Sequence, residues 1–330
     1  MINFHKRVLK ILIGCACLVS TLVDAEWVDH KFPIMGTEIR VRFWLPDSEQ
    51  AQKAKQAVID EMHHINNTMS PWIETSILSQ VNKHAFSKPV QVSEEFFNII
   101  QGAIKISEMT EGAFDITFSS VGYLYDYREK KQPTQAELQS KVPLINYRSL
   151  KLDKENRTIR YLQDGVKIDL GGIAKGLAVD NSIARLKSFG VTEASVTAGG
   201  DTYVLGDNGG KYWRIGIRHP RAEKKLVTVL PLANSAVSTS GDYERFFIDE
   251  NGERIHHIIN PTTGKSVASV QSVTILAENS TYADALSTSV FVLGVEKGLE
   301  LVNRLPNVSA IIVDKNGKLL HSDDLASPAT

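Results

Sequence analysis

The chain is poor in cysteine and carries no excess of charge of either sign. Its 330 residues include only two cysteines, Cys15 and Cys17, and its formal net charge is -1. Balanced charge, without clusters of arginine and aromatic residues, excludes the electrostatic footprint of a nucleic-acid-binding protein, so no nucleic acid is expected as a partner. Because both cysteines lie near the N-terminus, the rest of the chain cannot form a disulfide and must depend on its hydrophobic core.

Long apolar runs are also scarce, and the clearest one lies at residues 11–23, behind a basic start. It is too short to span a bilayer comfortably and has the layout of an export signal. Small residues up to Ala25 predict cleavage there, with a signal peptide over residues 1–25 and one domain over 26–330. A lipobox ending at Cys15, which would place a lipid on the cysteine, and an uncleaved membrane anchor are the alternatives. In each case the domain is expected to be exported.

Helical and strand patterns alternate irregularly along the remaining chain. Residues 37–45 alternate apolar and polar side chains, as in a half-buried strand. Helices are expected to begin near Asp47 and at Ser93, and another to end at Gly190, after which strand patterns dominate. Two further helical patterns lie on either side of Gly294. Since there is no regular β–α–β rhythm and no low-complexity linker, we expect one interleaved α+β domain with mixed or antiparallel sheets flanked by helices.

Residues 167–180, KIDLGGIAKGLAVD, pass from a buried strand through a double glycine into a helix. Glycines at such a junction allow the backbone to approach a ligand closely, and the first amides of a helix attract phosphate. Asp169, Gly172 and Lys175 would then lie beside a phosphate-bearing ligand. The spacing matches neither the P-loop nor the dinucleotide fingerprint. A tight turn followed by a solvated lysine is therefore an equal alternative.

A second segment, STYADALST at residues 280–288, predicts a helix capped by Ser280 or Thr281. Within it, Asp284 lies three residues before Ser287 and four before Thr288, so their oxygens share one helix face. A carboxylate beside hydroxyl groups suits Mg²⁺, which binds few protein carboxylates and leaves positions for phosphate oxygens. The alternative is that Asp284 only complements the helix dipole.

A pair of histidines, His256 and His257, ends a strand pattern before an Asn-Pro turn. Neighbouring strand residues point to opposite faces, so at most one imidazole faces a given cleft. That imidazole could act as a general base, although the pattern alone favours a surface pair. Trp72 lies on an expected loop, where an aromatic ring either stacks on a planar ligand or fills the core.

Taken together and in this order, these segments resemble the ApbE family of FAD:protein FMN transferases. The resemblance is carried by MGTEI (35–39), MSPWIETSILSQVN (69–82), GAFDIT (112–117), IDLGGIAKGLAVD (168–180), TAGGD (197–201), STSGDYERFF (238–247), HIINPTTGK (257–265) and ADALST (283–288). Each segment is a modest match, whereas the ordered set is highly specific.

The resemblance implies a periplasmic, Mg²⁺-dependent enzyme that splits FAD, transfers FMN to a threonine of a partner protein and releases AMP. Besides FAD, the implied partners are flavin-bearing subunits of membrane redox complexes. A lipid on Cys15 would add association with the inner membrane. Two alternatives use the same site: a Mg²⁺-dependent FAD pyrophosphatase that yields FMN and AMP, and a non-catalytic FAD-binding protein.

The resemblance also implies roles for individual residues. His257 matches the family's catalytic base. The positions that match FAD contacts are Met35, Trp72, Ala113, Phe114, Asp115, Asp169, Lys175 and Ile258. The positions that match metal ligands are Gly172, Asp284, Ser287 and Thr288. Gly172 can offer only its backbone carbonyl, and Ser287 stands where some relatives have a carboxylate, so its metal contact is expected to be weaker or to pass through water.

Overall fold

The computed structural model describes residues 27–222 and 224–326. The predicted signal peptide, its cleavage site after Ala25 and the alternative lipobox at Cys15 lie outside the described residues. An antiparallel sheet of eight strands, in the order β1-β2-β6-β7-β10-β13-β14-β15, forms the centre of the fold. Its strands are β1 (Trp27–Ile34), β2 (Thr37–Trp44), β6 (Ala194–Ala198), β7 (Asp201–Leu205), β10 (Ser235–Gly241), β13 (Val270–Ala277), β14 (Ser309–Asp314) and β15 (Leu319–His321).

Seven shorter strands form three small antiparallel sheets. They are β3 (Val90–Gln91), β5 (Thr158–Tyr161) and β4 (Leu150–Asp153) in one sheet, β8 (Trp213–Arg218) and β9 (Leu226–Leu232) in the second, and β11 (Phe246–Ile248) and β12 (Arg254–His256) in the third. The expected α+β class is therefore confirmed, and every strand pairing among the described residues is antiparallel.

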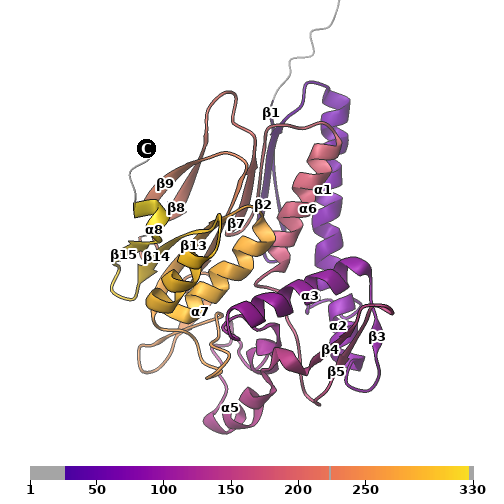
Figure 1. The fold of residues 1–330 in the computed structure, drawn as a ribbon, viewed down its shortest axis with the longest axis vertical. Helices are drawn as coiled ribbons and strands as arrows, with labels where there is room; N and C mark the ends of the chain where they lie inside the picture. Colours follow the sequence, from indigo (N-terminus) through magenta and orange to yellow (C-terminus); the bar gives the residue numbers. More distant parts are fainter. Residues whose placement is uncertain (1–26, 223, 327–330) are drawn as a thin grey trace, which may run out of the picture.

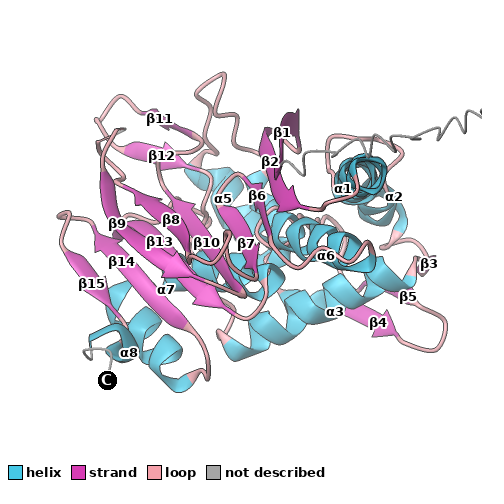
Figure 2. Cartoon of the chain, turned by 90° about the horizontal axis from the view of Figure 1, so that it is seen from above, coloured by secondary structure: helices cyan, strands magenta, loops and turns pink. Residues whose placement is uncertain are grey.

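Three long helices lie side by side against one face of the large sheet, with α6 between α1 and α7 (Figures 1 and 2). The helices are α1 (Ser48–Met69), α2 (Ile77–His84), α3 (Glu94–Met109), α4 (Ser119–Gly122), α5 (Gln135–Lys141), α6 (Ala174–Ser188), α7 (Ser280–Arg304) and α8 (Asp323–Ala326). Apolar side chains of α7, among them Leu286, Val290 and Phe291, join the core that β13 and β14 supply. Each such side chain contributes about 1.5–3 kcal/mol when fully buried. None of the described helices has the length and apolarity needed to cross a membrane.

The helix starts follow the capping signals of the sequence. Asp47 accepts a hydrogen bond from the Gln50 amide and begins α1, and Ser93 accepts one from the Phe96 amide and begins α3. The expected cap of α7 was wrong: Asn279 caps it by accepting a hydrogen bond from the Tyr282 amide, 2.9 Å away. The side-chain oxygen of asparagine readily accepts such a bond from a backbone amide, so Asn279 is the cap and the helix begins at Ser280, one residue before Thr281.

Helix α7 is interrupted at Gly294, whose φ of 78° and ψ of -171° are not helical. The two helical patterns that the sequence predicts on either side of this glycine are therefore confirmed. Only the part before Gly294 carries the oxygens of Asp284, Ser287 and Thr288. The core and the candidate site thus share the first half of one helix.

Candidate active site

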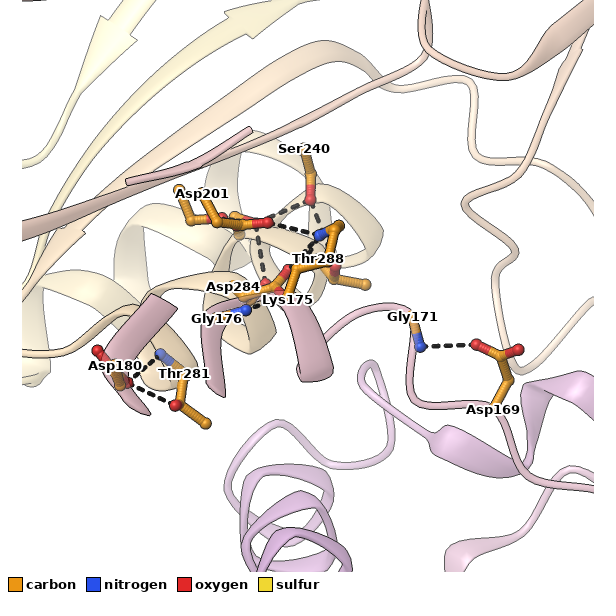
Figure 3. A network of polar contacts seen from close by, with 12 residues as sticks. Asp169, Gly171, Lys175, Gly176, Asp180, Asp201, Ser240, Thr281, Asp284 and Thr288 are labelled. Atoms are coloured by element: carbon orange, nitrogen blue, oxygen red, sulfur yellow. Dashed lines mark hydrogen bonds and ion pairs between the residues drawn. The ribbon is translucent and has the colours of Figure 1, made fainter. Parts of the chain in front are cut away.

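Segments that are distant in sequence meet beside the start of α6 (Figure 3). Lys175, in the first turn of α6, points its ammonium nitrogen at Asp201 Oδ2, 2.5 Å away, and lies 3.4 Å from Asp284 Oδ2. The loop before α6, which contains Gly171 and Gly172 and is called the glycine loop below, also approaches α7. A Cβ atom on Gly172 would lie 3.2 Å from Thr288 Oγ1. The structure therefore brings the predicted positions 172, 175, 284 and 288 into one place.

Helices α6 and α7 can approach this closely because their contact point is a glycine. A Cβ atom on Gly176 would lie 2.3 Å from the carbonyl oxygen of Ser280. Four residues later, the Asp180 carboxylate accepts hydrogen bonds from the backbone amides of Ser280 and Thr281, both at 2.8 Å. An α6 residue therefore stabilises the N-terminus of α7, where anionic groups are favoured. This arrangement sets where Asp284 lies.

Two carboxylates and one ammonium group share the centre of the site. Burial raises the pKa of Asp284 to about 7, the neighbouring Asp201 raises it as well, and Lys175 acts in the opposite direction. Burial alone would lower the pKa of Lys175, but the charges of Asp201 and Asp284 raise it above its ordinary value. The ammonium group therefore stays charged, and the centre has one more negative than positive charge when both carboxylates are ionised.

A group of hydroxyls covers the side of this centre that faces β10. Ser240 Oγ lies 2.8 Å from Ser287 Oγ and 3.3 Å from Thr288 Oγ1. The Ser287 hydroxyl is fully buried and also lies within 2.9 Å of the Asp284 carbonyl oxygen, to which it donates. Ser287 is thus engaged with the protein, while Thr288 lies closer to the glycine loop.

The donor set fits Mg²⁺. Asp284 offers a buried carboxylate, Thr288 a hydroxyl and Gly172 a carbonyl on the loop that approaches Thr288. These are hard oxygen donors, the class that Mg²⁺ prefers. The described residues contain no cluster of three or more histidine, cysteine and acidic side chains that could hold a metal ion. A cation here would therefore keep water or phosphate oxygens among its ligands, which is how Mg²⁺ sites are usually built.

The two adjacent histidines differ in what they contact. His256 is buried, its Nε2 lies 2.6 Å from the Val267 carbonyl oxygen, and its Nδ1 accepts a hydrogen bond from the Ile258 amide. In His257, Nδ1 is buried and has no hydrogen-bond partner among the described residues. Burial, His256 and the positive charge of Arg245 lower the pKa of His257 to about 3. Its imidazole is therefore neutral at pH 7.

The segment after α3 lies against the glycine loop. A Cβ atom on Gly172 would lie 3.3 Å from the Phe114 ring, while Ala113 precedes that ring on the same turn. The buried Asp115 carboxylate accepts hydrogen bonds from Thr117 N at 2.8 Å, Thr117 Oγ1 at 2.6 Å and Tyr147 N at 2.9 Å. Asp115 therefore orders this loop, and a role for its side chain in binding a ligand would compete with those bonds.

The other predicted FAD contacts lie on loops and turns. Met35 occupies the turn between β1 and β2 with a φ of 53°, and Trp72 is 88% exposed, which rules out a core position. One carboxylate oxygen of Asp169 accepts a hydrogen bond from the Gly171 amide, at 2.6 Å. Asp169 lies apart from Lys175, Asp201 and Asp284 (Figure 3). The Ile258 carbonyl already accepts a hydrogen bond from Val267, and its amide is bonded to His256.

Sequence reasoning gave no role to Asp201, Ser238, Ser240 and Arg245, although all four lie in the segments TAGGD and STSGDYERFF. Residues 238–241 belong to strand β10, which places two serines next to α7. Arg245 is exposed and has no ion-pair partner among the described residues, and a Cβ atom on Gly36 would lie 3.0 Å from its guanidinium. The signal that could have pointed to these residues is the presence of acidic residues and an arginine among the small residues of these two segments.

Comparison with known proteins identifies the family of this chain. The ApbE family model matches residues 35–312. Two curated relatives are both named FAD:protein FMN transferase: one from Haemophilus influenzae, 33% identical over 91% of this chain and 91% of its own, and one from Vibrio cholerae, 31% identical over 94% and 93%.

Two solved structures share the fold. The ApbE protein from Thermotoga maritima has a TM-score of 0.83 and 33% identity, covering 91% of this chain and 98% of its own. The flavin transferase ApbE from Vibrio cholerae has a TM-score of 0.82 and 29% identity, covering 92% and 99%. With a family model that spans most of its length and relatives that cover over nine tenths of it, this chain belongs to the ApbE family.

Proposed function

We propose that this protein transfers FMN from FAD to a threonine hydroxyl of an acceptor protein, with Mg²⁺, and releases AMP. The names of the relatives support flavin transfer. The observation that carries the proposal is the meeting of the glycine loop, Lys175 and the oxygens of α7 at one place. Such a centre combines cation ligands with a positively charged side chain, which is what a diphosphate requires.

In this proposal Asp284, Thr288 and the Gly172 carbonyl hold Mg²⁺, and Ser287 contacts it through water. When bound, the ion offsets the negative charge that develops on the phosphoryl oxygens during transfer. Lys175 and the first amides of α6 complement the remaining charge of the diphosphate. Asp169, whose second oxygen accepts no hydrogen bond from the described residues, faces the nucleotide.

Apolar and aromatic side chains orient the rings of FAD. Trp72 presents an exposed indole, which can stack on a planar ring system, Phe114 provides apolar surface beside Gly172, and Met35 lies on the turn between β1 and β2. Ala113 contributes through its small size, and Ile258 contributes next to His257. Because the Asp115 hydrogen bonds hold the segment that carries Ala113 and Phe114, this part of the ligand surface is already ordered.

His257 accepts the proton of the threonine hydroxyl. The threonine oxygen forms a bond to the phosphorus on the FMN side, the bond from that phosphorus to the bridging oxygen breaks, and the bridging oxygen leaves with AMP. A neutral imidazole is needed for this step, and the lowered pKa of His257 keeps it neutral at pH 7, although the same shift makes the imidazole a weaker base than an ordinary histidine. Its Nδ1 has no hydrogen-bond partner among the described residues, so none of them competes for that nitrogen.

We also propose that the domain works in the periplasm, after export directed by residues 1–25, with a lipid on Cys15 as the route to inner-membrane association. The acceptors are flavin-bearing subunits of membrane redox complexes. A covalent phosphoester suits that location, because it retains the flavin on a protein that cannot draw on the cytoplasmic pool.

The test is mass spectrometry of a candidate acceptor incubated with the protein, FAD and Mg²⁺, with AMP measured in parallel. The proposal expects an FMN adduct on threonine and one AMP per adduct. Asp284→Ala should abolish transfer, and His257→Ala should slow it by about 100-fold or more while FAD still binds. Asp207→Ala and His63→Ala are surface controls. AMP released at the full rate without acceptor would instead identify an FAD pyrophosphatase, and no AMP at all a flavin-binding protein.

A further inference from the structure

Asp201 is the charged residue at the centre to which the predicted roles assign nothing. It begins β7, is 1% exposed and is aligned with Ser238 of β10. Its Oδ2 lies 2.5 Å from Lys175 Nζ, and its Oδ1 accepts a hydrogen bond from Ser238 Oγ, also at 2.5 Å. Both carboxylate oxygens are therefore engaged by protein groups that come from two different elements.

Asp284 differs from Asp201 in this respect. The Lys175 ammonium lies 3.5 Å from Asp284 Oδ1 and 3.4 Å from Oδ2, too far for a short charge-assisted hydrogen bond. The closest contact of this carboxylate is the Gly176 amide, 3.1 Å from Oδ2. Asp284 therefore retains acceptor capacity that Asp201 has used, although one ammonium group lies between them (Figure 3).

We propose that Asp201 is a positioning residue that holds the Lys175 ammonium away from Asp284, so that the Asp284 carboxylate stays open to Mg²⁺. This inference rests on the proposed function. Without the negative charge of Asp201, Asp284 is the one carboxylate among the described residues that lies within 4 Å of the ammonium. A movement of under about 1 Å would then form a short ion pair on the oxygens that the cation needs.

The test measures Mg²⁺ binding by isothermal titration calorimetry, with MgCl₂ as the only titrant. Asp201→Asn should weaken binding by about 10-fold or more, since a charge-assisted bond must first be broken. The double variant Asp201→Asn with Lys175→Met should bind within about threefold of wild type, because the competing ammonium is gone. Failure of the double variant to recover would overturn the inference and would mark Asp201 as a ligand or a purely structural residue.

A charge-neutral variant separates positioning from the overall charge of the site. Ser238→Ala removes one anchor of Asp201, together with a 3.2 Å contact to Ser287 Oγ, and leaves every charge in place, so it should weaken Mg²⁺ binding by a few-fold. An unchanged Mg²⁺ affinity in Ser238→Ala would overturn the inference, because the change in the net charge of the site would then be enough to explain the other variants. Asp242→Asn is the matched control: Asp242 is a buried carboxylate paired with Arg221, and its loss should lower thermal stability without changing Mg²⁺ affinity.

Thermal unfolding of each variant shows whether it is folded at the temperature of the titration. If wild type itself binds no Mg²⁺, the metal part of the proposed function fails, and this inference fails with it. If wild type binds Mg²⁺ but the double variant does not recover, only the inference about Asp201 fails.

Discussion

Replacing Gly176 with alanine places a methyl group where α6 and α7 touch. The new Cβ atom would lie 2.3 Å from Ser280 O, 2.6 Å from Ser280 C and 2.7 Å from Thr281 Cα, all of which are backbone atoms. Ordinary contact begins at 3.4 Å, so the helices must part by about 1 Å. Separation of this size would also stretch the 3.1 Å bond from the Gly176 amide to Asp284.

The cost can be estimated from these contacts. Overpacking costs about 1–3 kcal/mol, and weaker bonds to Asp180 and Asp284 add about 1–2 kcal/mol. Alanine recovers about 1 kcal/mol through its higher helix propensity. We therefore expect Gly176→Ala to lower the free energy of unfolding by about 1–4 kcal/mol and Mg²⁺ affinity by about 10-fold. Urea unfolding followed by circular dichroism measures the first, and calorimetry the second.

Gly102→Ala in α3 is the matched control, because a Cβ atom there meets nothing within 4 Å. Its helix propensity should raise the free energy of unfolding by up to about 1 kcal/mol and leave Mg²⁺ binding unchanged. If Gly176→Ala matched wild type in both stability and Mg²⁺ affinity, the close crossing of α6 and α7 could not be what positions Asp284.

Three further predictions concern the nucleotide side of the site. Burial, His256 and Arg245 lower the pKa of His257 to about 3. The unfolded chain therefore takes up this proton first, and the free energy of unfolding falls as pH drops below about 6.5. Between pH 7.5 and pH 5, His257→Gln should lose about 1–2 kcal/mol less of its free energy of unfolding than wild type, measured by urea unfolding. Arg245→Met should weaken FAD binding by about 10-fold in flavin-fluorescence titrations, because its guanidinium lacks an ion-pair partner among the described residues. Trp72→Ala should weaken FAD binding but change stability by less than about 0.5 kcal/mol, because the side chain is 88% exposed.

Each of these has a comparison that can contradict it. Arg218→Met removes an arginine that is already paired with Glu244 at 2.5 Å, and should bind FAD normally. Equal losses of FAD affinity in Arg218→Met and Arg245→Met would mean that positive charge on the surface in general, and not Arg245 in particular, supports FAD binding. A destabilised Trp72→Ala would mean that the indole packs against the protein, and equal pH dependence of His257→Gln and wild type would mean that His257 titrates normally.

Local signals predicted the parts of the fold that depend on local chemistry. Asp47 and Ser93 marked real helix starts, because caps require particular residues within a few positions. The helix expected after the double glycine is α6, but the buried strand expected before it was wrong, since residues 166–170 form no regular element. The sequence analysis assigned no helix to the polar stretch 127–151, yet this stretch contains α5, whose Thr134 and Glu137 form a capping box. This signal was present in the sequence and was missed because the surrounding residues are polar.

The candidate site could be predicted only where a segment suggested its own chemistry. Asp284 and Thr288 share a helix face that periodicity reveals, but no periodicity places Asp201 beside Lys175. That contact depends on the order of strands in the sheet, which brings β7 next to β10 and both next to α7. Likewise, the sequence could not distinguish His256 from His257. The two differ because His256 is hydrogen-bonded to the carbonyl of Val267, which lies eleven residues further along the chain.

The break at Gly294 has a consequence for how much sequence change this protein can tolerate. In a continuous helix, a tilt caused by a substitution near Arg304 would be passed along the whole rod to Asp284. The non-helical backbone at Gly294 allows the second half of α7 to adjust by itself, with φ and ψ of one residue taking up the change. Insertions or fusions after Gly294 should therefore displace the oxygens at the other end less than they would in a continuous helix, although Leu301 and Val302 still pack in the core that the first half of α7 shares.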